Sequence, residues 1–169
     1  GNVTEHTALR NTAVYACVRI LSESLASVPL ILTKEDPDGG STHAYKHPWY
    51  NTLLNVANSE MTAFTLRETM QAHVVSWGNA YAWIERDAYG QPKGLWPLRP
   101  DRTWPERDPT SKELVYKTTL SNGEAVTLAQ NEMLHIPGLS FDGIKGYSPI
   151  GLCREAVGMA QATEEYGGR

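Results

Sequence analysis

Cysteine and long apolar runs are both scarce in this chain. Of its 169 residues only two are cysteines, Cys17 and Cys153, and each lies in an apolar, helix-like pattern. Small hydrophobic residues in such patterns are usually buried, so we expect both thiols in the core, and their spacing indicates neither a disulfide nor a metal site. The longest apolar runs, residues 13–18 and 28–32, fall far short of the roughly 18 residues that a membrane-spanning helix needs. The polar first residues do not resemble a signal peptide, so we expect a cytoplasmic protein with no membrane partner.

An excess of positive charge is also missing. The chain carries 19 acidic and 15 basic residues, for a net charge of −4. A domain that grips DNA by itself usually displays a basic patch, so this balance argues against one without excluding a surface that DNA slides past. The hydrophobic content of 41% and the charged content of 20% are those of a soluble globular protein, and the length suffices for one domain with its own core.

Catalytic motifs are largely lacking. No phosphate-binding loop, dinucleotide fingerprint or zinc spacing is found. The segment 146–151 approaches a nucleophile elbow, but Ile150 stands where the elbow needs glycine. We therefore interpret Ser148 as a helix N-cap and Pro149 as a first-turn residue. We expect no catalytic residue, no bound metal and no cofactor.

One alternative is a serine-type hydrolase. Its nucleophile would be Ser148, its base His135 and its acid a residue such as Asp142. Because His135 lies in an apolar strand, we favour a core histidine whose hydrogen bonds are satisfied.

Another alternative is a single-stranded nucleic-acid-binding module. Its bases would stack on four tryptophans, Trp77, Trp83, Trp96 and Trp104. Only a modest set of basic residues accompanies them, so burial in a core or a subunit interface is the favoured interpretation.

The strongest local signal lies in residues 77–100. A helix is predicted to end at Gly78, which suits a left-handed position because it has no Cβ. A β-hairpin is then predicted from residue 80 to residue 98, with its turn at Gly90 and its second strand stopped by Pro97 and Pro100. Three tryptophans near the hairpin's base can bury about 150 Å² or more each, so we expect them to nucleate the local core. These are Trp77, Trp83 and Trp96.

The remaining pattern predicts helices and short strands in one domain, residues 1–169. We expect helices over residues 7–27, from Pro48, over 63–77 after the N-cap Thr62, and from Ser148 to about Tyr166. The first is predicted to have one apolar face that includes Cys17, Ile20, Leu21 and Leu25, and the third to bury Phe64, Met70, Val74 and Trp77. Strands are predicted over residues 30–32, 103–106, 114–119 and 133–136, with a hairpin turn at Asn122-Gly123. The fold class is therefore α+β, with helices packed on small antiparallel sheets built from hairpins.

Four segments, in order and spanning nearly the whole chain, resemble the portal protein family of tailed bacteriophages, in the branch common in siphophages and prophages. They are AVYACVRILSESLASVPL, HPWYNTLLNVANSEMTAFTLRETM, WGNAYAWIERDAYGQPKGLWPLRPD and MLHIPGLSFDGIKGYSPIGLCREAVGMA. One departure is Val56-Ala57-Asn58, where the family usually has Pro-Asn.

This resemblance implies a structural protein rather than an enzyme. Portal subunits form a homo-oligomeric, usually dodecameric ring at the capsid vertex of the virion, assembled in the bacterial cytoplasm. Double-stranded DNA passes through the ring, which also contacts the capsid protein, the terminase large subunit and head-completion proteins. By resemblance this chain is the N-terminal wing part, without stem, clip or crown, so no DNA-contacting residue is assigned here. The structural or interface candidates are Trp77, Gly78, Asn79, Tyr81, Trp83, Gly90, Trp96, Gly146, Ser148 and Pro149.

Overall fold

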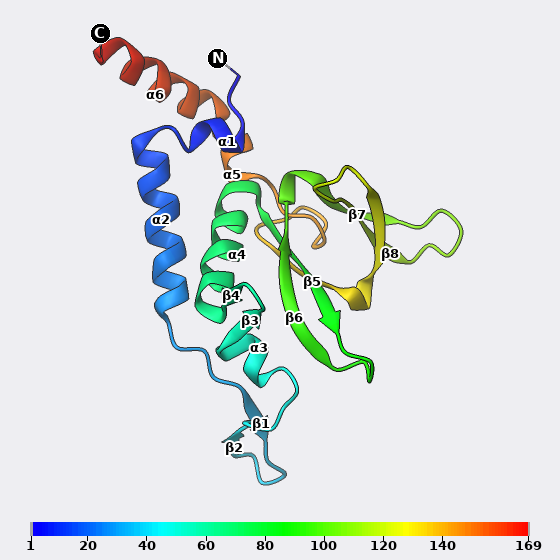
Figure 1. The fold of residues 1–169 in the computed structure, drawn as a ribbon. Coiled ribbons are helices and arrows are strands. Elements are labelled where there is room, and N and C mark those ends of the chain that lie inside the picture. The colour runs from blue at the N-terminus through cyan, green and yellow to red at the C-terminus, as the bar shows by residue number, and fades with distance from the viewer. Residues whose placement is uncertain (1, 169) are drawn as a thin grey trace.

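The computed structural model describes residues 2–168, and its helices pack on small antiparallel sheets, which confirms the α+β class (Figure 1). The helices are α1 (Glu5–Ala8), α2 (Thr12–Ser27), α3 (Tyr50–Leu54), α4 (Ala63–Trp77), α5 (Pro149–Leu152) and α6 (Arg154–Gly167). The strands are β1 (Thr33–Glu35), β2 (Ser41–His43), β3 (Val56–Asn58), β4 (Met61–Thr62), β5 (Asn79–Arg86), β6 (Pro92–Leu98), β7 (Thr103–Arg107), β8 (Leu114–Thr119), β9 (Ala125–Ala129) and β10 (Met133–Pro137). Single 3-10 turns, Pro100–Arg102 and Gln130–Glu132, precede β7 and β10.

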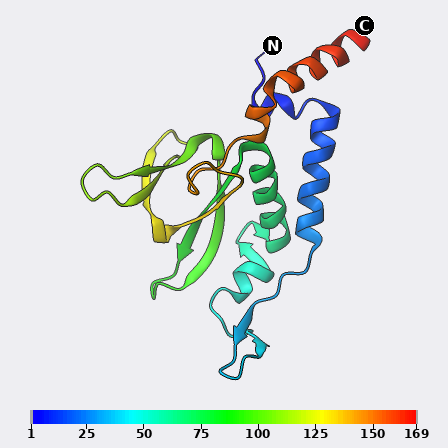
Figure 2. The same cartoon turned by 180° about the vertical axis from the view of Figure 1, so that it is seen from behind.

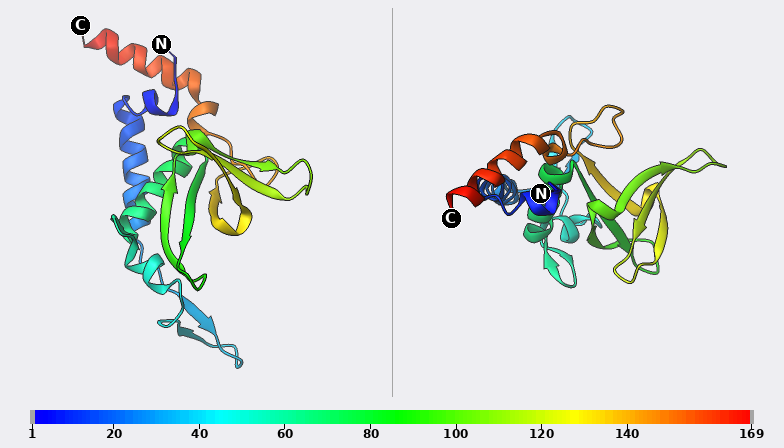
Figure 3. Two further views of the ribbon diagram at one scale, coloured as in Figure 1. Left: turned by 45° about the vertical axis from the view of Figure 1, so that its right-hand side comes forward. Right: turned by 90° about the horizontal axis from the view of Figure 1, so that it is seen from above.

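The body has three layers (Figures 1 and 3). Helices α2 and α4 lie side by side, and α4 packs on a central sheet of order β10-β5-β6. A second sheet, β7-β8-β9, packs on the other face of the central sheet. Because successive side chains of a strand point to opposite faces, β5 directs Ala80 and Ala82 toward α4 and Tyr81 toward the second sheet. The hairpin β1–β2 protrudes at the far end of the body from α6.

The predicted hairpin is confirmed, except at its second proline. Strands β5 and β6 pair antiparallel, with Trp83 opposite Trp96, and Gly90 adopts φ +79° in the turn. Contrary to the prediction, Pro97 does not stop the strand but lies inside it opposite Ala82. The strand ends at Leu98, before Pro100, as predicted. Strand β6 is an edge strand, and proline is tolerated there because its missing N–H can face away from the ladder.

The tryptophans do not nucleate the core, so that prediction was wrong. The main cluster consists of small and aliphatic residues, each at most 5% exposed, while all three tryptophans are only half-buried. Alanine at positions 80 and 82 lets α4 approach β5 closely, which leaves no room for an indole ring. The cluster is Ala57, Leu66, Met70, Ala80, Ala82 and Leu95.

The predicted helix over residues 7–27 is two helices. Chain direction changes before Asn11, whose side-chain oxygen accepts a hydrogen bond from the Val14 N–H at 3.1 Å and so caps α2. The predicted apolar face of α2 is exposed, with Ile20 57% and Leu21 50% accessible. Helix α2 instead packs on α4 through small residues that include Ser22 and Ala26, since small side chains allow close helix contact.

Several burial predictions for single residues were wrong. Cys17 and Cys153 are both exposed free thiols, the first on the outer side of α2 and the second between α5 and α6. Phe64 is 42% exposed, whereas Met70 on the same helix is buried as predicted. The predicted strand at residues 30–32 is not formed, and β1 begins only at Thr33.

The N-cap predictions at Thr62 and Ser148 are confirmed. The Thr62 hydroxyl accepts from the Thr65 N–H, and the Ser148 hydroxyl accepts from the Gly151 N–H. The last helix is interrupted at Cys153, and its second part, α6, extends past the top of α2 (Figure 2). Among residues 2–168, none of the helices combines the length and the apolar character that crossing a membrane requires.

Candidate functional site

Six of the ten sequence candidates meet at one junction. The end of α4, the start of β5, the end of β10 and the start of α5 converge there, and the loop of residues 138–147 closes over it (Figure 2). The six residues are Gly78, Asn79, Tyr81, Gly146, Ser148 and Pro149. The other four make none of these contacts: Trp77, the last residue of α4, packs against His6 and His73, and Trp83, Gly90 and Trp96 lie in the hairpin β5–β6.

Two glycines allow the loop to approach the helix end. Gly78 has φ +80°, the left-handed cap predicted from the sequence, and its N–H donates to the Val74 carbonyl at 2.8 Å. A Cβ at position 78 would overlap the carbonyl group of Tyr147, and one at position 146 would overlap the carbonyl of Gly78. The Gly138 N–H also donates to the Gly78 carbonyl, at 2.8 Å. Both positions therefore require glycine for steric reasons.

Asn79 ties the same loop to the sheet. Its side-chain Nδ2 donates to the Gly146 carbonyl at 3.0 Å, and its Oδ1 accepts from the Gly146 N–H at 2.8 Å. The side-chain amide thus takes the place of a backbone partner for Gly146. Asn79 is only 4% exposed, so these bonds are shielded from water and their loss would leave buried groups unpaired.

His135 extends this hydrogen-bonded chain to Tyr116 in the second sheet. Both of its ring nitrogens are engaged: Nε2 lies 2.9 Å from the Asn79 Oδ1, and Nδ1 lies 3.1 Å from the Tyr116 hydroxyl. Because Asn79 Oδ1 can only accept, Nε2 carries the proton and Nδ1 accepts from Tyr116. The ring stacks on Tyr81, with centroids 4.5 Å apart. Burial lowers the pKa of His135 to about 4, so the ring is neutral at neutral pH, and the predicted satisfied core histidine is confirmed.

Tyr81 is fully buried between the sheets. Burial raises the pKa of the Tyr81 phenol well above its usual range, so its hydroxyl stays protonated. Its ring contacts that of Tyr116 edge-on, with centroids 6.0 Å apart. Such aromatic contacts contribute packing energy beyond simple burial, and Tyr81 therefore serves the contact between the two sheets.

Ser148 acts as a cap and a tether. Its hydroxyl accepts from the Gly151 N–H at 2.9 Å and lies 2.7 Å from the Glu5 Oε1 and 3.2 Å from the Ser76 carbonyl. Pro149 is the first residue of α5, where its missing N–H is not needed. These bonds join α5 to both the N-terminal segment and the end of α4.

The residues named for a hydrolase do not form a catalytic set. His135 has both nitrogens occupied by Asn79 and Tyr116, so it has no free nitrogen to activate Ser148. Asp142 accepts from the N–H groups of Ile144 and Lys145 in its own loop. Those backbone hydrogen bonds hold the pKa of Asp142 down at about 2. Each group is engaged by partners of its own, and the hydrolase alternative is not supported.

The tryptophans do not form one stacking surface. Trp96 donates its Nε1–H to the Glu85 Oε2 at 2.8 Å in the hairpin, and Trp104 belongs to the second sheet. Trp77 is packed edge-on against two imidazoles, those of His6 at 5.1 Å and His73 at 5.7 Å between ring centroids. The nucleic-acid alternative therefore finds no continuous row of rings for successive bases.

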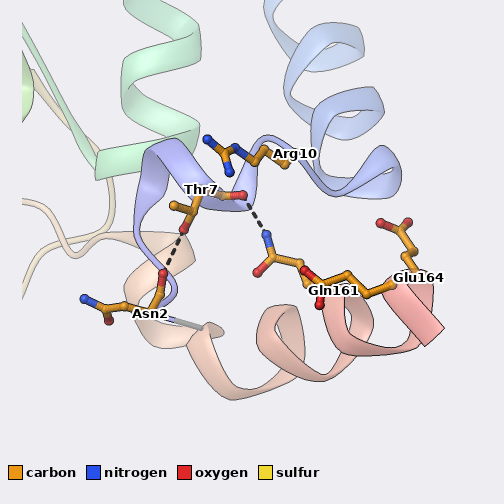
Figure 4. A pocket seen from close by; sticks show the side chains of 6 residues that line it. Asn2, Thr7, Arg10, Gln161 and Glu164 are labelled. Carbon is orange, nitrogen blue, oxygen red and sulfur yellow. Dashed lines mark hydrogen bonds between the residues drawn. The ribbon is translucent and has the colours of Figure 1, made fainter. Parts of the chain in front are cut away.

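A polar crevice of about 300 Å³ lies between the N-terminal segment and α6, and hydrogen bonds join these two segments beside it (Figure 4). The Thr7 hydroxyl donates to the Asn2 carbonyl at 3.1 Å, and the Gln161 Nε2 donates to the Thr7 carbonyl at 2.6 Å. Apolar contacts between Val3, Ile150 and Val157 support the same joint. One side of α6 is therefore fixed to the body.

Five strongly exposed apolar residues, two in a loop and three on or beside α6, were not predicted from the sequence. Leu139 and Phe141, in the loop over the junction, are 82% and 90% exposed. Leu152, Met159 and Tyr166, on or beside α6, are 70–86% exposed. Their spacing of seven residues was a readable signal for one side of a helix, whereas nothing local identified the loop residues.

The comparisons with known proteins agree with the resemblance. A family model described as "Phage portal protein" matches residues 12–169. This chain belongs to the phage portal protein family. The portal protein of Enterobacteria phage HK97 is 28% identical over 98% of this chain, and a probable portal protein of Streptomyces phage phiC31 is 29% identical over 99% of it. The family is one of structural proteins, not of enzymes.

Solved structures share the fold of this portal-family chain. A chain from the neck of an empty gene transfer agent particle, computed with C6 symmetry, has a TM-score of 0.80 at 22% identity, and the match covers 99% of this chain and 46% of that one. An HK97-family portal protein from Corynebacterium diphtheriae has a TM-score of 0.65 at 16% identity, and the match covers the whole of this chain and 50% of the other. The chain spans only 38% of the length of the two phage relatives.

Proposed function

We propose that this chain is the N-terminal wing part of a longer portal protein, which assembles as a ring at the capsid vertex. The observation that carries the proposal is the family match over residues 12–169. The similarity of fold to neck chains supports it, since structures of such necks are described with C6 and C12 symmetry.

The ring is the conduit for double-stranded DNA during packaging and ejection. It is a homo-oligomer, dodecameric in the complete protein, and docks the terminase large subunit, head-completion proteins and the capsid protein. DNA is contacted by regions outside this chain, consistent with its net charge of −4. The protein is part of the virion and is assembled in the bacterial cytoplasm.

Within the wing, the buried junction residues have a structural role. Gly78, Asn79, Tyr81 and Gly146 are buried and cannot touch another subunit, so their role is to fix the angle between α4, the central sheet and α5. The half-exposed candidates Trp83 and Trp96 are the ones that can contact a neighbouring subunit. A rigid wing suits a ring because small angular errors accumulate around a closed assembly.

Electron microscopy of the complete gene product tests this proposal. We expect closed rings of one rotational order in purified, DNA-free protein. A complete protein that stays monomeric over the whole accessible concentration range would contradict it.

A further inference from the structure

An apolar groove of about 340 Å³ lies between the C-terminal end of α2 and the central sheet. Its floor is formed by core residues of α4 and β6, and its rim by Leu25, Val28, Leu30 and Ile136, which are 43–59% exposed. Nothing within residues 2–168 covers this rim. We call this feature the α2 groove.

The α2 groove contains a guanidinium without an acidic partner. Arg67 on α4 lines it and donates to two backbone carbonyls, from Nη1 to Leu53 and from Nη2 to Ala26, both at 3.2 Å. Its Nε is buried and has no hydrogen-bond partner, and none of the ion pairs found in residues 2–168 includes Arg67. A partly buried charge is stabilised by an opposite charge close by, so a carboxylate is the ligand that the groove lacks.

The second uncovered surface is on the outer side of α6. Met159 is 73% and Tyr166 86% exposed, and Leu152, seven residues before Met159, is 70% exposed. At 100° per residue Met159 and Tyr166 lie on the side of α6 opposite Val157 and Gln161, through which the helix is fixed to the body. Leu152 is the last residue of α5, just before the break at Cys153. We call this row the α6 stripe.

The α6 stripe matches the α2 groove in charge as well as in polarity. Glu155 flanks the stripe, and α6 also carries Glu164 and Glu165 against a single basic residue, Arg154. An amphipathic helix that lays an apolar row into an apolar groove is a recurrent recognition mode, with anchors spaced three, four and seven residues apart. An acidic side chain beside that row would supply the missing partner of Arg67.

Helix α6 cannot fill the groove of its own chain. It leaves the body at the N-terminal end of α2 and points away from the C-terminal end, where the groove lies (Figures 1 and 3). A ring with more than two copies closes through two different surfaces on each copy, which must be complementary to each other. We propose that the α6 stripe of one copy lies in the α2 groove of the next copy, with Glu155 beside Arg67. This inference rests on the proposed ring function.

Mixing two variants of this 169-residue chain tests the contact. Met159→Asp removes the stripe and leaves the groove, whereas Leu25→Asp damages the groove and leaves the stripe. Tyr89→Asp, at a hairpin-tip residue that is 90% exposed, is the matched control. Because each charge would be buried in an apolar contact, we expect each variant alone to self-associate at least about tenfold more weakly than the wild type in sedimentation equilibrium.

The mixture gives the decisive result. One intact stripe and one intact groove remain in it, so we expect dimers and nothing larger, while Tyr89→Asp behaves as the wild type. Circular dichroism checks that each variant is folded. Unchanged association of both single variants, or a mixture that forms no dimer, overturns the proposal.

The same substitutions in the complete portal protein separate this inference from the function. Rings from the wild type and from Tyr89→Asp, with about tenfold fewer from Met159→Asp, support both. Equal ring yields from all variants would show that the ring does not need this contact, and would overturn the inference while leaving the function intact. Absence of rings from the wild type would contradict the function itself.

Discussion

The side-chain amide of Asn79 pairs with both backbone polar groups of Gly146, 67 positions further along the chain. Through this pair the loop of residues 138–147 is joined to the first residue of β5. The His135 ring hydrogen-bonds to the same Asn79 oxygen, so β5, β10 and the loop share one polar centre.

Asn79→Ala should destabilise the chain strongly. The substitution leaves the Gly146 N–H and carbonyl and the His135 Nε2–H without their partner, and each buried unpaired group is expensive. We expect a loss of about 2–4 kcal/mol in the free energy of unfolding, measured by urea denaturation. Asn122→Ala is the control, because Asn122 is exposed and bonds only within its own turn. Equal losses of unfolding free energy in the two variants would show that the bonds between Asn79 and Gly146 do not stabilise the fold more than an exposed turn does.

Substituting Gly78 and Gly90, which share the same backbone conformation, separates the cost of backbone strain from the cost of a steric clash. Gly78 and Gly90 have φ of +80° and +79°, but a Cβ meets the Tyr147 carbonyl at position 78 and nothing within 4 Å at position 90. Gly90→Ala should cost about 1 kcal/mol, the strain of a left-handed alanine alone. Gly78→Ala should cost more than about 3 kcal/mol or prevent folding, because the backbone of the loop must move. Thermal melting of both variants measures the difference, and similar melting temperatures would mean that the loop yields easily.

Acidification should weaken the fold between pH 6.5 and pH 4. Burial lowers the pKa of His135 and that of His73 to about 4, from 6.5. The unfolded chain therefore binds these protons first, so the stability is complete above pH 6.5 and falls as the pH drops toward 4. Asp142, whose pKa lies at about 2, changes the stability only below pH 4.

Urea denaturation at pH 7 and pH 5 measures this effect. A His73→Gln, His135→Gln double variant should be less stable at pH 7 but should lose less stability at pH 5 than the wild type. An identical loss in both proteins would assign the acid sensitivity to other groups.

Ser148→Ala should lower the stability of the fold and should not change any enzymatic activity. The cap to the Gly151 N–H and the bond toward Glu5 are lost, which we expect to cost about 1–2 kcal/mol. Ser148→Thr keeps a capping hydroxyl and should recover most of the loss. An activated-ester assay run beside the melting curves should detect no turnover in any of the three proteins. Turnover by the wild type that Ser148→Ala abolishes would contradict the structural interpretation.

Local signals in the sequence were sufficient for the caps and the hairpins. Gly78, Thr62 and Ser148 mark helix ends because these residue types suit the cap positions, where backbone N–H and C=O groups lack partners within the helix. This preference is local and does not depend on distant contacts. Packing was harder to predict. The apolar pattern of α2 correctly indicated a helix but not which side faces α4, because that contact is made by small residues such as Ala26. The junction itself depends on pairs far apart in the chain, such as Asn79 and Gly146, which no local pattern relates.

Native mass spectrometry of the particles formed by the complete portal protein measures directly whether this chain belongs to a closed ring. We expect one dominant species at the mass of a dodecamer. A protein that gives only the monomer mass at every concentration would contradict it.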